Sequence, residues 1–330
     1  MTTQPPSPAL RLGTRRSALA TTQSQTVADA LTAATGRAVE LVEVTTLGDT
    51  SSEHLTQIGG TGVFVTALRA ALLEGSIDLA VHSLKDLPTA DEPGLVVAAV
   101  PRREDPRDAL VARDGLTLGE LPVGARIGTG SPRRAAQLLA LGLGHEPEPV
   151  RGNVGTRVAM VTDGRLDAVV LARAGLLRLG REHQVTEVLD PLQVLPAPGQ
   201  GALAIECRGA DHQLVELLQV LEDPDARAAV TAERALLAAL EAGCTAPVGA
   251  LAEVVEDAAG GLEISLRAVV AAPDGTVVLR QSLVGPAEDP TGLGRRLAAL
   301  LLEDGAAELV DRSTTAVHPS ADQHLPERAS

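Results

Sequence analysis

Residues 77–88 read Ile-Asp-Leu-Ala-Val-His-Ser-Leu-Lys-Asp-Leu-Pro, an apolar run that predicts a strand over Ile77 to His82 and then ends at a charged pair. Short apolar runs of this kind alternate with helical patterns from Leu10 onward. That alternation is typical of an α/β protein in which helices cover a mostly parallel sheet. Further strands are predicted at Glu40 to Thr45, Leu95 to Val100, Ala125 to Gly128 and Ala168 to Leu171.

The predicted helices carry start and stop signals. They are Ser17 to Thr35 before Gly36, Val63 to Glu74 before Gly75, Pro132 to Leu141 with proline in its first turn, and Ala226 to Leu240. Beyond the last of these, Leu262 to Val270 and Thr276 to Leu283 alternate as an antiparallel sheet with one solvated face would, and Pro273-Asp274-Gly275 predicts the hairpin between them.

Lys85 is the one lysine in this chain, and the other 27 of the 28 basic residues are arginine. A compact ammonium with a tunable pKa suits sites that reject the planar guanidinium, so the exception draws attention to this position. Asp86 follows it directly and could act as a general acid or base beside an anion clamp. Survival of one surface lysine by chance is an equally good reading of the local sequence.

Composition excludes several classes of function. The chain has 330 residues, a net charge of -15 and a single aromatic residue, Phe64. A surface that stacks nucleic-acid bases on aromatic rings is therefore nearly excluded, and an acidic protein repels phosphate backbones. We expect no membrane insertion, because no apolar run of spanning length occurs, and the start of the chain lacks a signal-peptide pattern. The sequence predicts a cytoplasmic protein.

Two proline-containing stretches, 100–106 and 195–201, look like crossings between domains. The two cysteines offer no metal spacing or disulfide framework. Cys207 lies in a strand-like run and is expected in the core, whereas Cys244 lies in a loop where a thiol is more easily reached. The histidines show no metal-ligand spacing, and we expect His82 to be a satisfied buried imidazole.

Five segments combine glycine or hydroxyl residues with a cation at a predicted strand-to-helix junction, where backbone N–H groups and the helix dipole favour anions. They are residues 13–17, 59–62, 128–134, 151–157 and the run around Lys85. In an open sheet such loops converge at the carboxyl ends of the strands, so we expect one crevice between two sheet domains. Its arginines imply a ligand with many carboxylates or phosphates.

These segments resemble, together and in order, the porphobilinogen deaminase (hydroxymethylbilane synthase) family over residues 10 to about 310. The specific motifs are AVHSLKDLPT (80–89), REDPRDAL (103–110), GTGSPRR (128–134), RGNVGTR (151–157), LPAPGQGALAIECR (195–208) and ERALLAALEAGC (233–244). The resemblance implies a transferase of porphyrin and heme biosynthesis that joins four porphobilinogen molecules head to tail, releases ammonia each time and yields hydroxymethylbilane.

The resemblance also implies the fold and its division. We expect three domains: two sheet domains like those of bilobal periplasmic binding proteins and a smaller α+β domain. Residues 9–102 and 199–220 would form domain 1, 103–198 domain 2 and 221–312 domain 3, with 1–8 and 313–330 disordered. It further implies a monomer that hands its product to uroporphyrinogen-III synthase.

The resemblance assigns roles to individual residues. Asp86 would be catalytic, protonating the departing amine, and Cys244 would carry a dipyrromethane cofactor made from the substrate. The cofactor and substrate carboxylates would be bound by a set of cations and polar groups: Arg15, Ser17, Ser83, Lys85, Thr129, Ser131, Arg133, Arg134, Arg151, Arg157 and Gln200. Phe64 would contact a ring, although core packing is its default reading. No metal ligand is implied.

The chain departs from the family pattern at Leu47 and Thr61, where many members have cations in a mobile lid, and at Gly130, where many have serine. Two other functions stay open on the residues alone. One is a non-catalytic carboxylate-binding protein with the same crevice. The other is an enzyme in which Lys85 forms a Schiff base with a carbonyl substrate.

Overall fold

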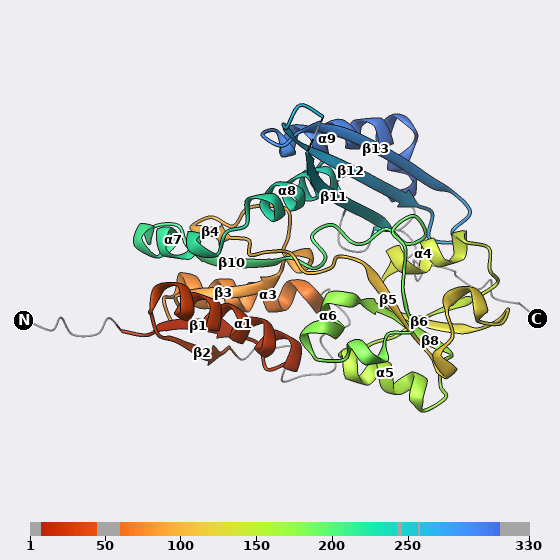
Figure 1. Ribbon diagram of the computed structural model, residues 1–330, viewed down its shortest axis with the longest axis horizontal. Coiled ribbons are helices and arrows are strands. Elements are labelled where there is room, and N and C mark those ends of the chain that lie inside the picture. The colour runs from red at the N-terminus through yellow and green to blue at the C-terminus, as the bar shows by residue number, and fades with distance from the viewer. Residues whose placement is uncertain (1–7, 45–59, 243–245, 257, 311–330) are drawn as a thin grey trace, which may run out of the picture.

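The computed structural model describes residues 8–44, 60–242, 246–256 and 258–310, and of residues 60–64 it describes the backbone only. Three sheets organise this part of the chain, two of five strands and one of three. Figure 1 shows the two larger sheets beside each other, with the third sheet above them. The three sheets therefore lie around the segments 100–106 and 195–201, where the chain crosses between the two larger sheets.

The first sheet has the order β2-β1-β3-β10-β4. Its elements, with the helices around them, are β1 (Leu10–Thr14), α1 (Ala18–Thr35), β2 (Val39–Glu43), α3 (Gly60–Leu73), β3 (Leu79–Ser83), β4 (Leu95–Ala99), β10 (Leu203–Arg208) and α7 (His212–Leu218). Strand β10 returns to this sheet from the second one and lies antiparallel between β3 and β4. Residues far apart in the sequence thus share one core.

The second sheet has the order β7-β6-β8-β5-β9. Its elements are β5 (Asp108–Ala112), β6 (Arg126–Thr129), α4 (Pro132–Ala140), β7 (Glu146–Pro149), α5 (Val154–Thr162), β8 (Ala168–Ala172), α6 (Arg173–Arg178) and β9 (Glu187–Val188). Strand β5 runs antiparallel to both of its neighbours. The prediction of a mostly parallel sheet is confirmed for both sheets, because four of the five strands in each run in one direction and only the strand that follows a crossing, β10 or β5, runs against them.

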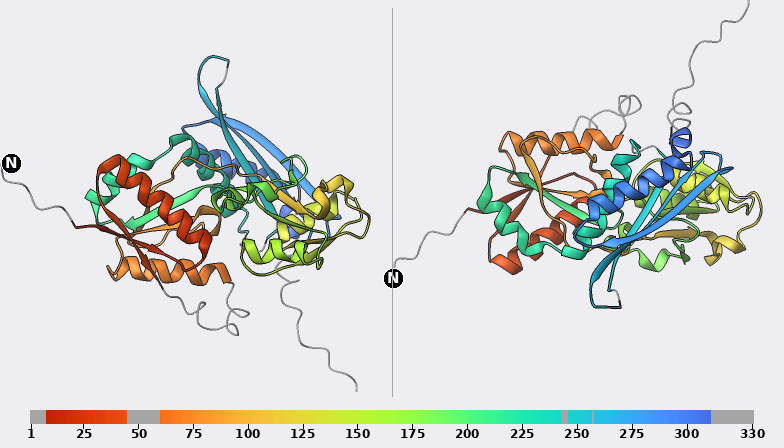
Figure 2. Two further views of the ribbon diagram at one scale, coloured as in Figure 1. Left: turned by 60° about the horizontal axis from the view of Figure 1, so that its bottom comes forward. Right: turned by 90° about the horizontal axis from the view of Figure 1, so that it is seen from above.

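The third sheet is antiparallel, in the order β11-β12-β13. Its elements are α8 (Pro224–Ala239), β11 (Val248–Glu256), β12 (Leu262–Ala271), β13 (Val278–Pro286) and α9 (Pro290–Glu303). The two helices pack against one face, as the view from above in Figure 2 shows for α9. The predicted hairpin at residues 273–275 is confirmed, with Gly275 at φ 72°.

Helix boundaries follow the local chemistry predicted from the sequence. Ser17 caps α1 by accepting a hydrogen bond from Ala20, and Gly36 ends it in the left-handed conformation. Ser131 caps α4 in the same way, with Pro132 in its first turn. Both caps place a hydroxyl residue just beyond the end of a strand, β1 or β6.

Single 3-10 turns occur at Leu84–Asp86, Arg113–Gly115, Leu118–Glu120, Glu182–Gln184 and Gln219–Leu221. None of the helices in the described ranges has the length and hydropathy needed to span a bilayer.

Candidate active site

Two cavities meet at the turn that follows β3. The first, of about 500 Å³, and the second, of about 690 Å³, are both lined by Lys85, Asp86 and Arg157. The turn is fixed by Leu84, whose side chain is buried and whose amide donates to the carbonyl of Ala202 at 3.0 Å. The buried side chain of Leu84 thus holds Lys85 and Asp86 where the two cavities meet.

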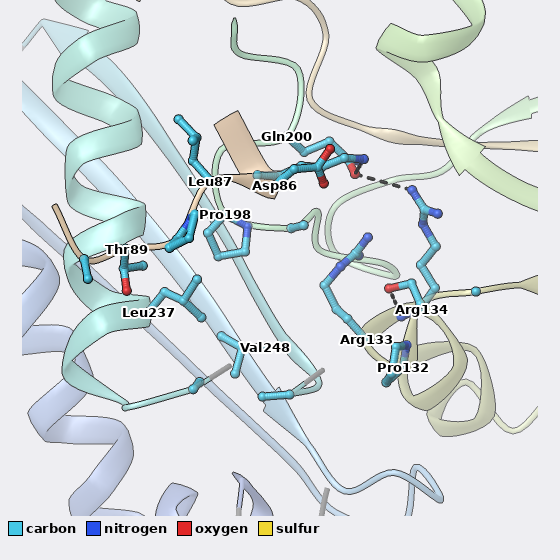
Figure 3. Close-up of a pocket in the computed structure, with 18 of the residues that line it drawn as sticks. Asp86, Leu87, Thr89, Pro132, Arg133, Arg134, Pro198, Gln200, Leu237 and Val248 are labelled. Carbon is cyan, nitrogen blue, oxygen red and sulfur yellow. Dashed lines mark hydrogen bonds between the residues drawn. The ribbon is translucent and has the colours of Figure 1, made fainter. Parts of the chain in front are cut away.

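The first cavity lies between the two large sheets and the third domain. Figure 3 shows Arg133 and Arg134, on α4, reaching toward Asp86 and Gln200 from one side, while Leu237 and Val248 approach from the other. The wall thus combines cations with apolar side chains. Such a wall suits a ligand that has flat rings and peripheral carboxylates.

Arg133 and Arg134 share one buried carboxylate, Asp108 on β5. The distances are 2.9 Å from Arg133 Nη2 to Asp108 Oδ2 and 2.7 Å from Arg134 Nη2 to Asp108 Oδ1. Burial alone would raise the pKa of Asp108, but the charges of the two arginines lower it well below its usual value. One carboxylate leaves two guanidinium groups only half neutralised, so the site keeps a net positive charge for an anionic ligand.

Gln200 links these arginines to the charged turn. Its amide nitrogen donates to Asp108 Oδ1 at 2.7 Å, and its oxygen accepts from Lys85 Nζ at 3.3 Å and from Arg134 Nη2 at 3.4 Å. Desolvation and the nearby charge of Arg134 lower the pKa of Lys85 to about 8, against the opposing effect of Asp86. Lys85 therefore holds its proton less firmly than an ordinary lysine does.

The second cavity also borders Asp86 and is lined by residues of helices α1, α5 and α6. Ser17, Ser83 and Arg15 line it from the first sheet. Ser83 is held by Gln23, whose amide nitrogen donates to Ser83 Oγ at 3.1 Å. Arg157 lies across the cavity, with its Nε donating to the carbonyl of Gly152 at 2.9 Å. Hydroxyl groups and cations therefore converge here, as the strand-end argument predicted.

Most of the predicted site residues lie at these cavities. Those lining one or both are Arg15, Ser17, Ser83, Lys85, Asp86, Ser131, Arg133, Arg134, Arg157 and Gln200. Thr129 is buried at the end of β6, where its hydroxyl accepts from the amide of Ser131 at 3.2 Å. Arg151 is exposed and lines neither cavity.

Several predicted residues lie outside the described part of the chain. Cys244 and Leu47 belong to ranges that the structure does not describe, and the side chains of Thr61 and Phe64 are likewise outside it. Gly130 is described and lines the first cavity. A Cβ atom at Gly130 would lie 2.8 Å from the carbonyl oxygen of Val150, so the local backbone leaves no room for the serine expected from the family pattern.

The sequence argument missed three residues of the site. Arg178 and Arg181 line the second cavity, and burial lowers the pKa of Arg178. Asp108 organises the first cavity from within an apolar strand. Asp108 begins the apolar run Asp-Ala-Leu-Val-Ala, which is itself a signal that could have predicted this site. A carboxylate at the start of a buried strand requires a cationic partner.

The two residues expected in the core are buried. Cys207 has no exposed surface, and burial raises its thiol pKa to about 11, which disfavours reaction there. His82 Nε2 lies 3.1 Å from Glu206 Oε2, and Arg69 Nη2 lies 2.9 Å from Glu206 Oε1. His82 therefore belongs to a buried polar cluster behind the site.

The sheets and cavities define a multidomain α/β protein with a cation-lined site for a polycarboxylate that carries rings. Comparison with known proteins agrees. The family model for "Porphobilinogen deaminase, dipyromethane cofactor binding domain" matches residues 10–216, and the model for "Porphobilinogen deaminase, C-terminal domain" matches residues 227–303. The chain belongs to the porphobilinogen deaminase family, as its motifs indicated. It is a transferase of tetrapyrrole biosynthesis that condenses porphobilinogen to hydroxymethylbilane.

Curated relatives match over nearly the whole chain. Porphobilinogen deaminase from Nocardia farcinica is 63% identical over 305 residues, covering 91% of this chain and 88% of the relative. Porphobilinogen deaminase 1 from Streptomyces coelicolor is 60% identical over 310 residues, covering 92% and 97%. Among solved structures, the methionine-binding protein MetQ is 13% identical with a TM-score of 0.39, covering 64% of this chain and 88% of its own.

Proposed function

We propose that Asp86 is the acid–base residue of the condensation and that the two cavities hold the two pyrrole components on either side of it. The observation that carries this proposal is the position of Lys85 and Asp86, which line both cavities. Joining two pyrrole rings releases ammonia, so an acid that protonates the departing amine must lie where the two rings meet. The carboxylate of Asp86 is half-buried at that point.

Cys244 is the proposed attachment point of the dipyrromethane cofactor. Ala242 and Ala246, the described residues that flank the undescribed positions 243–245, both line the first cavity. The described residues on both sides of this segment thus line one and the same cavity, which supports attachment at Cys244.

The residues of the first cavity fit such a group. Its acetate and propionate side chains require cations, which Lys85, Arg133, Arg134 and Arg157 supply, and its rings require the apolar wall that Leu237 and Val248 form. When bound, the group supplies the free pyrrole carbon to which the next ring is joined. No metal ligand enters this scheme.

The chain's own residues then perform the proton transfers on porphobilinogen. Protonated Asp86 donates to the aminomethyl nitrogen, the C–N bond breaks, and ammonia leaves behind a cationic azafulvene that the resulting carboxylate stabilises. The exocyclic carbon of the azafulvene would form the new C–C bond with the free ring carbon that the bound group supplies, and Asp86 would take up the proton that this ring carbon loses. Lys85 holds a carboxylate beside the reacting atoms, while Ser17, Ser83, Thr129, Ser131, Arg15, Arg151 and Gln200 complete the proposed binding set, and Phe64 a ring contact.

The lowered pKa of Lys85 also suits a Schiff-base enzyme, because a neutral amine is the nucleophile in that chemistry. Borohydride reduction in the presence of substrate discriminates between the two functions. A reduced adduct on Lys85 would support the Schiff-base alternative, whereas the proposed condensation leaves Lys85 unmodified.

Further proposals concern organisation and context. We propose domains at 9–102 with 199–220, at 103–198 and at 221–312, supported by the return of β10 to the first sheet. We also propose a cytoplasmic monomer that hands hydroxymethylbilane to uroporphyrinogen-III synthase. Sedimentation, and product transfer measured with and without that second enzyme, test these points.

The decisive experiment is the denatured intact mass of the purified protein, followed by peptide mapping. We expect an added mass of two linked pyrrole units on Cys244, and none on the Cys244→Ser variant. An unmodified protein that incubation with porphobilinogen does not convert, and that releases no ammonia, would contradict both the proposed attachment at Cys244 and the proposed role of Asp86. An adduct that maps to Cys207 would overturn the attachment site.

A further inference from the structure

Arg181 follows α6 and, like Ser17, lines the second cavity. Its backbone is fixed, because its amide donates to the carbonyl of Leu176 at 2.8 Å. Its guanidinium lies over the first turn of α5: a Cβ atom at Gly155 would be 3.3 Å from Arg181 Nη2 and 3.4 Å from Asn153 Oδ1. Glycine at position 155 thus leaves the guanidinium room beside the helix terminus.

The charge of Arg181 lacks a counterion within the described residues, where none of the ion pairs involves it. Its neighbour Glu182 pairs instead with Arg173, at 3.3 Å. The first turn of α5 holds no acidic residue, and its N–H groups add positive potential. The guanidinium of Arg181 and the N-terminus of α5 therefore both present positive charge to the same space, and no described acidic residue of that first turn offsets it.

The second cavity as a whole has the same imbalance. Apart from Arg15, the described residues that line it include four cations, Lys85, Arg157, Arg178 and Arg181, and one carboxylate, Asp86. Arg178 and Arg157 each donate one hydrogen bond to a backbone carbonyl, at 2.7 Å to Gly201 and 2.9 Å to Gly152. Neither contact neutralises charge; the carboxylate of Glu104 lies close enough to Arg178 to oppose the lowering of its pKa, whereas Arg181 has no such partner among the described residues.

We infer that Arg181 binds a carboxylate of the incoming porphobilinogen in the second cavity and so sets substrate affinity without contacting the reacting atoms. This inference rests on the proposed function. The incoming ring is favoured over the bound chain because the residues flanking Cys244 line the first cavity and not the second. The guanidinium supplies two parallel donors, which a carboxylate accepts in a bidentate manner.

The test compares initial rates of Arg181→Gln, Arg181→Lys and the wild type, each carrying its cofactor. Loss of one charge-assisted contact at a partly exposed site raises KM for porphobilinogen by about tenfold and leaves kcat within about twofold. Arg181→Lys keeps the charge but loses the two parallel donors of the guanidinium, so its KM should lie between those of the wild type and Arg181→Gln. The control is Arg165→Gln, an exposed arginine that lines neither cavity and pairs with Asp163.

Unchanged KM in Arg181→Gln would overturn the inference, as would a fall in kcat alone. Intact masses of the enzyme intermediates of Arg181→Gln add a second criterion. We expect all four additions to slow equally at low substrate concentration. Slowing confined to the later additions would assign Arg181 to the bound chain and contradict the proposal. Failure of the proposed function is distinguishable, because the wild type would then show no dipyrromethane adduct and no ammonia release.

Discussion

The carboxylate of Glu233 on α8 is fully buried and accepts two hydrogen bonds from Arg103, at 2.7 and 3.0 Å. The same carboxylate accepts from the amides of Gly199, at 2.6 Å, and Ala252, at 2.8 Å. Arg103 and Gly199 lie on the two crossings between the large sheets, and Ala252 lies on β11. One acidic side chain therefore joins both crossings to the third domain.

We expect Glu233→Gln to lower the free energy of unfolding by about 3 kcal/mol, because removal of one partner leaves a buried guanidinium uncompensated. Urea or guanidinium unfolding measures the change. Arg296→Gln, which breaks an exposed pair with Asp289, is the matched control and should cost no more than about 1 kcal/mol. Equal effects of the two variants would contradict a special role for the buried carboxylate.

Asp86→Asn should reduce turnover at least about 100-fold while leaving the unfolding transition unchanged, because the amide is nearly isosteric but cannot transfer a proton. Ammonia release in single-turnover experiments is the direct measurement. A variant that keeps more than about a tenth of wild-type activity would show that another group supplies the proton.

The lowered pKa of Lys85 predicts a pH dependence. The ammonium is charged below pH 8 and becomes neutral above it, so its hold on a substrate carboxylate weakens as pH rises, while the arginines stay charged. We expect kcat/KM to fall above about pH 8, with a smaller change in kcat, since a bound carboxylate favours the protonated amine. Lys85→Arg should lack this step, and a flat wild-type profile between pH 7 and 9 would refute the assignment.

Gly130→Ser tests the departure from the family pattern. The new Cβ would lie 2.8 Å from the backbone oxygen of Val150 and 3.5 Å from Arg157 Nη2. We expect destabilisation by about 1 to 3 kcal/mol from overpacking, together with a higher KM because Arg157 is displaced. Gly119→Ser, where a Cβ meets nothing within 4 Å, is the control. A hydroxyl that instead improved affinity would mean that the loop relaxes to accept it.

Local features of the fold could be predicted from the sequence where one residue type determines the outcome. Ser17 and Gly36 bound α1 because a hydroxyl cap and a left-handed glycine act within a few residues. The direction of β10 could not be read in this way. Its pairing with β3 joins segments more than a hundred residues apart, and an apolar run pairs equally well in either orientation.

The site shows the same division. The strand-end argument placed Arg15, Ser83 and Arg157 in one crevice correctly, because loop position follows from sheet topology. It did not show that Arg133 and Arg134 are buried on Asp108, which lies 25 and 26 residues away. The place of Arg181 in the site could not be predicted, because its guanidinium lies over the first turn of α5, a segment that is distant from it in the sequence.

The two crossings between the large sheets bear on how the enzyme moves. Two fixed connections define an axis, so the relative motion left to the sheet domains is rotation about it. Arg103 and Gln200 lie at the crossings, joined by a 2.9 Å hydrogen bond from Arg103 Nε to the carbonyl of Gln200. Ser17, which precedes α1, and Asn153, which precedes α5, line the second cavity from the two different sheet domains. Rotation would thus widen or narrow that chamber while Lys85, bonded to Gln200, stays near the pivot.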